Sequence, residues 1–188
     1  MHPYNQSGLT LPELIISLSI ISVLSTSGLS GMQRLIQENR MAAEVNQFVT
    51  VLHLARSEAV KHGQRVLLCP SSDGHNCGNS REWVNGWIVF ASHDREHDMD
   101  EQLLQAGTPF SPGIRMNSSN HRKRIVYQPD GNSPGTNTSF TFCDSRKRAK
   151  PRVICLSNTG RPRLTLTRCD GKPILCSVRN WKNTRIRR

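Results

Sequence analysis

Two arginines in the C-terminal third of the chain carry side chains that can bind phosphate. Arg161 and Arg163 belong to a Gly-Arg-Pro-Arg segment at residues 160–163. Side chains two residues apart on an extended chain lie on the same side, so a turn at Gly160 is expected to place both guanidinium groups on one face. A guanidinium fork matches the oxygens of a phosphate bidentately. These residues are the first candidates for a polyanion-binding site.

The distribution of charge favours a polyanionic partner. The 188 residues have a formal net charge of +11. Residues 1–111 contain 7 Lys and Arg against 11 Asp and Glu, whereas residues 112–188 contain 18 against 3, a net charge of +15. So uneven a field attracts polyanions, with nucleic acid, anionic lipid headgroups and lipopolysaccharide as candidates. A soluble basic surface without such a partner is the simpler alternative.

Further cations are expected to widen this basic surface. They lie in the loop after Cys143 and in the tail of residues 179–188: Arg146, Lys147, Arg148, Arg179, Lys182, Arg185, Arg187 and Arg188. Trp181 is expected either to stack on a base or to seal the tail onto the rest of the protein. Because phosphate contacts position a nucleic acid without reading its sequence, DNA binding here would be largely sequence-independent.

A single carboxylate lies near the start of the longest apolar segment. Glu13 is the only ionisable side chain between Leu9 and Met32. At a rise of about 1.5 Å per residue, this segment is long enough to cross a hydrocarbon core of roughly 30 Å. A carboxylate there costs about 2.5–3.5 kcal/mol at a helix centre. Glu13 should therefore meet a cationic partner or reach the membrane interface.

Six cysteines follow the apolar segment: Cys69, Cys77, Cys143, Cys155, Cys169 and Cys176. Their even number and their place outside the cytoplasm predict disulfides. A Cys69–Cys77 bond is the most secure, because it closes the turn of residues 70–76. For the other four, local pairs (143–155 and 169–176) compete with a long-range pair that ties the C-terminal end to Cys143. Zinc held by Cys69, His75 and Cys77 is a weaker alternative, because no CxxC spacing is present.

The apolar pattern predicts one long helix from about Leu9 to His62. No proline interrupts it after Pro12, and Gly63 is well placed as its C-cap. Apolar residues recur at spacings of three and four and form one stripe: Ala42, Val45, Phe48, Leu52, Ala55 and Ala59. Gly28 and Gly31 weaken the helix by about 1 kcal/mol each and mark a place for bending or melting.

Short strands are expected after Gln64. The candidate runs are residues 65–69, 83–90 with a turn at Asn85-Gly86, 103–104, 114–116, 124–127, 139–143, 153–156 and 163–167. Turn signals occur at residues 129–131, 133–135 and 158–160. A helix followed by strands predicts an α+β head, with an antiparallel sheet packed on the apolar stripe of the helix.

No enzyme is expected. The chain contains no HExxH, Walker or GxSxG motif, and neither a metal site nor a cofactor is predicted. The acidic segment of residues 94–101 lacks the ligand spacing of a calcium loop and is expected to be solvated.

The N-terminus resembles the class III signal of type IV prepilins and pseudopilins. Gly8, Thr10, Leu11 and Glu13 match the family pattern of a glycine followed by F-T-L-x-E, with Leu9 in place of the usual phenylalanine. The resemblance implies that a prepilin peptidase cuts after Gly8 and N-methylates Leu9. It also implies that Glu13 meets the methylated amine of a neighbouring subunit during assembly.

The rest of the chain resembles the FimT/GspH family of minor pilins and pseudopilins. The matching blocks are residues 68–74, Cys77, Trp83, residues 86–90 and residues 158–163. The Cys-Pro-Ser and Gly-Trp-Ile-Val-Phe blocks favour the FimT side. The resemblance implies a type IV pilin fold, whose long N-terminal helix is transmembrane in its first half and packs on an antiparallel β-sheet head. In FimT-like pilins a G-R-x-R turn is associated with DNA binding.

The expected organisation is a leader at 1–8, a transmembrane and assembly helix at 9–31, a periplasmic head at 32–178 and a basic tail at 179–188. The head continues the helix to about residue 62 and is then β-rich. The resemblance implies a single-pass inner-membrane protein whose head is periplasmic and becomes extracellular in the pilus. Its partners would be major and minor pilins, the prepilin peptidase and DNA.

We expect a minor type IV pilin that binds DNA for uptake in natural transformation. One alternative is a purely structural or assembly-priming minor pilin, or a type II secretion pseudopilin, without DNA binding. Another is adhesion to anionic lipids or glycans.

Overall fold

The computed structural model describes residues 10–81, 83–92, 102–119 and 122–176, with the backbone alone at residues 26–30. Within these residues one helix, α1 (Leu11–His62), precedes all the strands. The strands are β1 (Arg65–Pro70), β2 (Trp87–Ser92), β3 (Gln102–Gly107), β4 (Ile114–Ser118), β5 (Ile125–Tyr127), β6 (Thr138–Asp144), β7 (Arg152–Leu156) and β8 (Pro162–Thr165).

The limits of α1 follow from local residue chemistry. Thr10 is extended and precedes the helix, and a proline lies in the first turn, where the fixed φ of proline suits a helix start. Gly63 has the left-handed conformation with φ of 62°, and its N–H donates to the carbonyl of Ala59. The predicted C-cap is therefore confirmed. The helix is continuous across Gly28 and Gly31, so these glycines do not melt it here.

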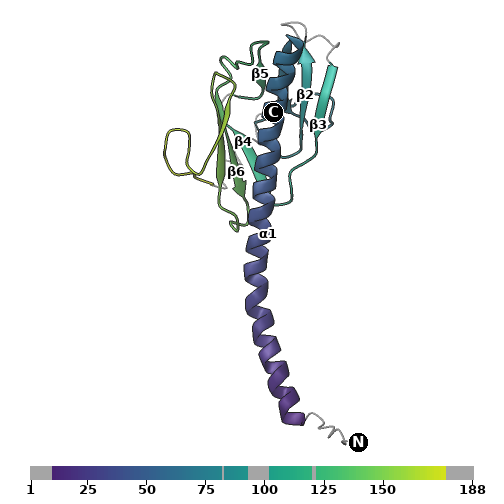
Figure 1. The fold of residues 1–188 in the computed structure, drawn as a ribbon, viewed down its shortest axis with the longest axis vertical. Coiled ribbons are helices and arrows are strands. Elements are labelled where there is room, and N and C mark those ends of the chain that lie inside the picture. The colour runs from purple at the N-terminus through teal and green to yellow at the C-terminus, as the bar shows by residue number, and fades with distance from the viewer. Residues whose placement is uncertain (1–9, 82, 93–101, 120–121, 177–188) are drawn as a thin grey trace, which may run out of the picture.

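Two four-stranded antiparallel sheets pack beside the C-terminal half of α1 (Figure 1). Their strand orders are β3-β2-β1-β5 and β4-β6-β7-β8. The sequence predicted the antiparallel strands but not their division into two sheets. That division depends on pairs distant in sequence, such as β1 with β5 and β4 with β6.

The strand predicted at residues 83–90 begins later than expected. β2 starts at Trp87, and Trp83 lies before a turn, with its N–H donating to the carbonyl of Met116 at 3.3 Å. Trp83 is fully buried. The prediction was wrong here because a buried tryptophan has the composition of a strand residue whether or not it pairs in a sheet.

The core lies between α1 and the two sheets. Val45, Phe48, Leu52, Ala55 and Ala59 of the predicted stripe are fully buried. The Phe48 ring makes edge-to-face contacts with three aromatic rings, at centroid distances of 5.7 Å to Trp83, 4.8 Å to Phe140 and 6.1 Å to Phe142. Helix and strands are thereby held as one unit. Ala42 is only half-buried, and the neighbouring Met41 is buried instead.

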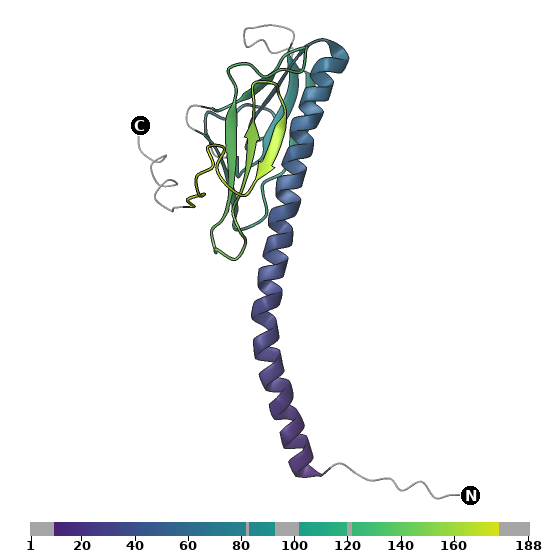
Figure 2. The same cartoon turned by 60° about the vertical axis from the view of Figure 1, so that its left-hand side comes forward.

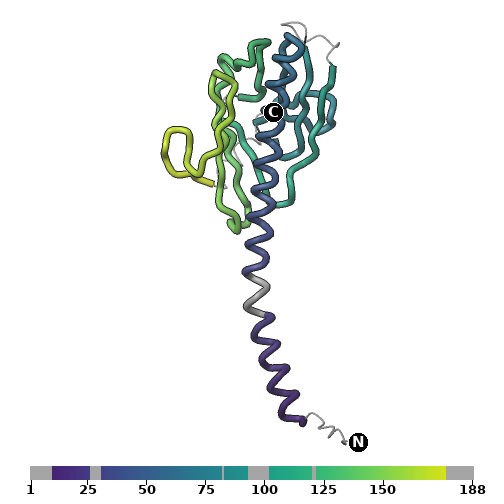
Figure 3. Tube along the Cα trace, in the orientation of Figure 1, coloured from purple at the N-terminus to yellow at the C-terminus, as the bar shows by residue number. Residues whose placement is uncertain are grey.

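The N-terminal half of α1 projects away from the head (Figure 2). The Cα trace in Figure 3 follows the same path from this projecting half into the strands. Most of its large apolar side chains are exposed, from Leu11 through Leu24 and again at Met32, Leu35 and Ile36. None of the helices in the described part of the chain combines the length and apolarity expected of a membrane-crossing segment.

Candidate nucleic-acid interface

The Gly-Arg-Pro-Arg segment forms the turn that leads into β8. The N–H of Gly160 donates to the carbonyl of Ser157 at 3.0 Å, and β8 begins at Pro162. β8 pairs antiparallel with β7, with Cys155 opposite Arg163 and Leu156 opposite Pro162. Arg161 and Arg163 therefore flank a proline at the start of the edge strand of the second sheet.

Gly160 packs tightly against the turn that follows β5. It has a φ of 72°, and a Cβ at this position would clash with the carbonyl oxygen of Gly131 and lie 3.0 Å from the ring of Tyr127. The N–H of Ser133 donates to the carbonyl of Asn158 at 2.7 Å. These contacts fix the turn that carries the two arginines.

Arg56 of α1 contacts the turn on which Gly160 packs. The Nε of Arg56 donates to the carbonyl oxygen of Gly131 at 3.0 Å. The position of the arginine turn is thus linked through Gly131 to the helix. Sequence reasoning missed Arg56 and Gly131, because their pairing spans 75 residues and leaves no local signal.

Both arginines border one open groove of about 700 Å³. The groove is also lined by polar residues of β6 and of the turn after β7, among them Ser139, Asn158 and Thr159, and none of the described residues that line it is acidic. Arg161 and Arg163 are exposed, and neither forms an ion pair with a described residue. Their guanidinium groups are available to an anionic ligand.

The disulfides join the C-terminal segment to the second sheet. Cys155 of β7 pairs with Cys169, and Cys143 of β6 pairs with Cys176. Cys155 and Cys169 also line the groove, so their bond holds the segment after β8 beside the arginines. Of the two pairings left open by the sequence, the structure has the long-range one.

The Cys69–Cys77 disulfide is present as predicted. Because both thiols are consumed, they are not zinc ligands in this structure. Asp73 organises the closed loop by accepting hydrogen bonds from the N–H groups of His75 and Asn76. Hydrogen bonds from Asn76, with those from His75 and Ser71, hold the pKa of Asp73 well below its usual range.

Arg146 and Arg148 are not among the described residues that line the groove. Arg146 and Arg148 lie in the connection that precedes β7, whereas the turn to Arg161 follows it. The five residues of β7, at about 3.3 Å each, separate these two groups by about 15 Å along the strand. Arg179, Trp181, Lys182 and Arg185 lie outside the described residues, as do Gly8, Leu9 and the acidic segment of residues 94–101.

Comparison with known proteins identifies the family. The family model "Type II transport protein GspH" matches residues 44–160, and the prokaryotic N-terminal methylation motif matches residues 3–29. A search of curated proteins finds no match.

The fold is similar to that of solved minor pilins. The minor pilin FimU of Pseudomonas aeruginosa PAO1 has a TM-score of 0.56 at 18% identity, over 69% of this chain and 90% of that chain. A second crystal form of FimU gives a TM-score of 0.53 at 18% identity, over 66% and 91%. The minor pseudopilin EpsH of the Vibrio cholerae type II secretion system follows, with a TM-score of 0.46 at 12% identity, over 67% and 96%. The chain belongs to the GspH family of minor pilins and pseudopilins and has a type IV pilin fold.

Proposed function

We propose that this minor pilin is incorporated into a type IV pilus and binds DNA for uptake in natural transformation, through Arg161 and Arg163. One observation carries the proposal: two exposed guanidinium groups without a described acidic partner border the same open groove. Phosphates bind such groups bidentately, and contacts of this kind do not depend on base sequence.

The rest of the basic half adds long-range attraction. Residues 112–188 have a net charge of +15, and charge of this size steers a polyanion toward the head. In this proposal Arg146 and Arg148 raise the affinity from outside the groove, and Arg179, Lys182 and Arg185 raise it further through their positive charge. The family is made of structural pilins rather than enzymes, so a binding function is consistent with it.

Processing and assembly would place the subunit, with its groove, in the pilus filament. We infer cleavage after Gly8 by a prepilin peptidase, methylation of Leu9, and insertion of residues 9–31 in the inner membrane with the head in the periplasm. Glu13 would then meet the N-terminal amine of a neighbouring pilin, a pairing favoured in a low-dielectric environment.

Serine hydroxyls in the projecting half of α1 support insertion of this segment. Ser17, Ser19 and Ser25 each donate to the backbone carbonyl four residues earlier, at 2.7–2.8 Å. These hydroxyl protons are therefore satisfied inside the helix, as a lipid environment requires.

The test is DNA binding by the detergent-solubilised full chain, measured by fluorescence anisotropy with a short duplex. An Arg161→Gln/Arg163→Gln variant should bind at least tenfold more weakly, because it loses two phosphate contacts. An Arg168→Gln/Lys172→Gln variant is the matched control. It removes the same charge from exposed residues in the adjacent segment, and Arg168 already pairs with Asp170 at 3.4 Å. The motif assignment is wrong if the first variant binds as tightly as the parent.

A structural or assembly-priming subunit, or a secretion pseudopilin, is the second candidate, because the matching family model describes a type II transport protein. Transformation of a deletion strain separates the two functions. If the deletion strain complemented with the Arg161→Gln/Arg163→Gln gene still forms pili but takes up DNA poorly, the DNA-binding function is supported. Normal transformation by that strain favours the structural role.

A further inference from the structure

A second basic group lies in the connection between β6 and β7. We call it the basal loop and define it by Arg146, Lys147, Arg148 and Lys150, all of which are exposed. Asp144, which ends β6, is 5% exposed. Its carboxylate accepts hydrogen bonds from the N–H groups of Arg146 at 3.0 Å, Arg148 at 2.8 Å and Ala149 at 3.0 Å.

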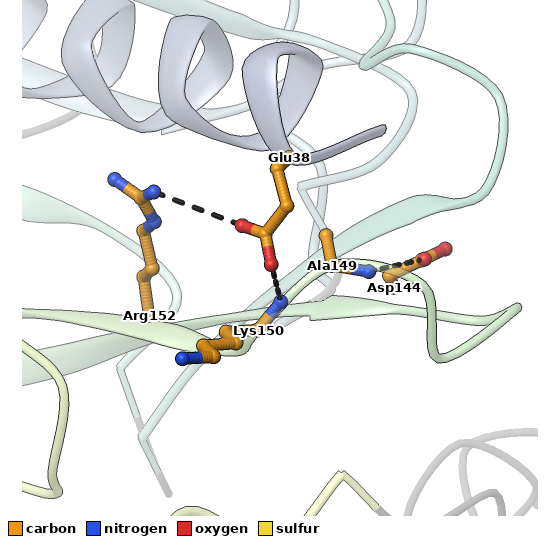
Figure 4. A network of polar contacts seen from close by, with 5 residues as sticks. All are labelled: Glu38, Asp144, Ala149, Lys150 and Arg152. Atoms are coloured by element: carbon orange, nitrogen blue, oxygen red, sulfur yellow. Dashed lines mark hydrogen bonds and ion pairs between the residues drawn. The ribbon is translucent and has the colours of Figure 1, made fainter. Parts of the chain in front are cut away.

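The helix α1 holds the same loop from the other side. The Nε2 of Gln37 donates to Asp144 at 3.3 Å, and Glu38 accepts a hydrogen bond from the N–H of Lys150 at 2.8 Å. Glu38 also lies 3.9 Å from the guanidinium of Arg152. Figure 4 shows Glu38 between Arg152 and the backbone of Lys150, with Asp144 bonded to Ala149 beside them.

These contacts leave the cations of the loop without a carboxylate partner among the described residues. Asp144 and Glu38 are engaged mainly by backbone N–H groups, and no described acid forms an ion pair with Arg146, Lys147, Arg148 or Lys150. Glu44, the next carboxylate along α1, is held by the N–H of Ser111 at 2.8 Å. The loop is therefore a fixed, exposed cluster of positive charge.

The place of the loop in the molecule indicates what it meets. Figures 1 and 2 show the end of β6 at the end of the head that faces the projecting half of α1. Gln37 and Glu38, which hold the loop, follow directly on the exposed apolar residues Met32, Leu35 and Ile36. The rise of about 1.5 Å per residue puts Glu38 about 9 Å beyond Met32 along the helix. This is close to the Debye length of about 8 Å at physiological ionic strength.

We propose that the basal loop binds the headgroups of anionic phospholipids while the subunit is still in the membrane, and so sets the height and tilt of the head above the bilayer. The proposal rests on the proposed membrane insertion of residues 9–31. Cationic side chains about one Debye length from an anionic bilayer surface are still attracted to it. Long Lys and Arg side chains suit this position, because their charged ends can reach the headgroups from a fixed backbone.

This role differs from that of the groove at Arg161 and Arg163, which lies at the other end of β7. A flexible cluster would not define a height for the head. Here the backbone is fixed to Asp144 and to the helix, and Lys147 itself has a left-handed φ of 56°. Once the subunit leaves the membrane for a filament, the same cations are released from lipid.

The test uses the full chain in nanodiscs of phosphatidylcholine alone, or of phosphatidylcholine mixed with phosphatidylglycerol. A fluorophore on Ser145→Cys, an exposed position in the loop connection, reports quenching by a nitroxide on the lipid headgroups. Mass spectrometry confirms that the three native disulfides are intact. We expect at least twofold stronger quenching in the anionic discs, and loss of this difference at high salt.

The variant Arg146→Gln/Lys147→Gln/Arg148→Gln should remove most of the difference between the two lipids. Lys61→Gln/Arg168→Gln/Lys172→Gln removes the same charge from the end of α1 and the segment after β8 and should preserve it. Lys147→Gly suits the left-handed backbone, so it keeps the fold and should remove about a quarter of the difference, since Lys147 is one of the four cations of the loop.

Three other outcomes would overturn the proposal, and each would identify a different step as wrong. If the chain does not enter nanodiscs, the membrane insertion on which the loop depends is wrong. If it enters but quenching is the same in both lipids, only the role of the basal loop is wrong. If the triple loop variant keeps its lipid response but binds DNA as poorly as the Arg161→Gln/Arg163→Gln variant, the loop belongs to the DNA surface instead.

Discussion

The conformation of Gly160 places Arg161 and Arg163 at the groove. Its φ of 72° lies in the left-handed region, and the space for a Cβ is already occupied by the carbonyl of Gly131. An alanine at position 160 must therefore adopt a strained backbone. It must also push the turn away from Gly131, whose carbonyl accepts the hydrogen bond from Arg56. The positions of Arg161 and Arg163 therefore depend on a glycine at residue 160.

We predict that Gly160→Ala lowers the free energy of unfolding by about 2–4 kcal/mol and weakens DNA binding several-fold. Chemical denaturation and fluorescence anisotropy measure the two effects. Gly135→Ala is the matched control, because Gly135 has a similar φ of 68° and a Cβ added to it would meet nothing within 4 Å. It should cost only about 1–2 kcal/mol and leave DNA binding intact. Equal losses in both variants would contradict the packing role of Gly160.

At the scale of elements, Asp144 organises the connection between β6 and β7. Burial alone would raise the pKa of this carboxyl group, but hydrogen bonds from Arg146, Ala149, Arg148 and Gln37 lower it overall. An unfolded aspartate has a pKa of about 3.9. The stabilisation by Asp144 is therefore complete above that pH and is lost as the pH falls through the lower value of the folded state.

We predict that Asp144→Asn lowers the free energy of unfolding at neutral pH by about 1–3 kcal/mol, because an amide cannot accept all the hydrogen bonds that the carboxylate accepts. Its stability should also fall less than that of the parent as the pH drops from about 5 to below 3. Urea denaturation over this range measures both. Asp73 and Asp130, whose pKa values are also lowered by hydrogen bonds, are common to both proteins and cancel in the comparison. Parallel pH curves would show that Asp144 does not contribute.

At the scale of the whole molecule, the apolar half of α1 and the two basic sites occupy different parts of the protein. The apolar half of α1 projects from the head, while the groove lies at the far end of β7 from the basal loop. Both basic sites belong to residues 112–188, which have a net charge of +15. Salt should therefore weaken binding to DNA strongly, since each phosphate contact releases counterions.

We predict a log–log slope of DNA affinity against salt near −3.6, for about four neutralised phosphates of a duplex. The Arg161→Gln/Arg163→Gln variant should give a slope near −1.8, because two contacts are removed. Anisotropy titrations at several salt concentrations measure both slopes, with Arg168→Gln/Lys172→Gln expected to retain most of the parent slope. An unchanged slope in the groove variant would place the phosphate contacts elsewhere.

Much of the architecture was predictable because its signals are local. The end of α1 at His62 follows from Gly63, and the buried face from Val45 through Ala59 follows from helical spacing. The strands from β4 to β8 lie within a few residues of the predicted runs. The prediction that Arg161 and Arg163 act together follows from their spacing, because they flank a proline directly after the turn glycine Gly160.

What the sequence by itself determined is the family, the long helix, the α+β class and the motif that carries two arginines. The tertiary structure decided the two-sheet arrangement, the pairing of Cys155 with Cys169 and of Cys143 with Cys176, and the packing of Gly160 on Gly131. It also separated the basal loop from the groove, although both are basic segments of the same region of sequence. The physical reason is that strand order and register depend on contacts between distant residues, whereas caps, turns and periodicity depend on neighbours alone.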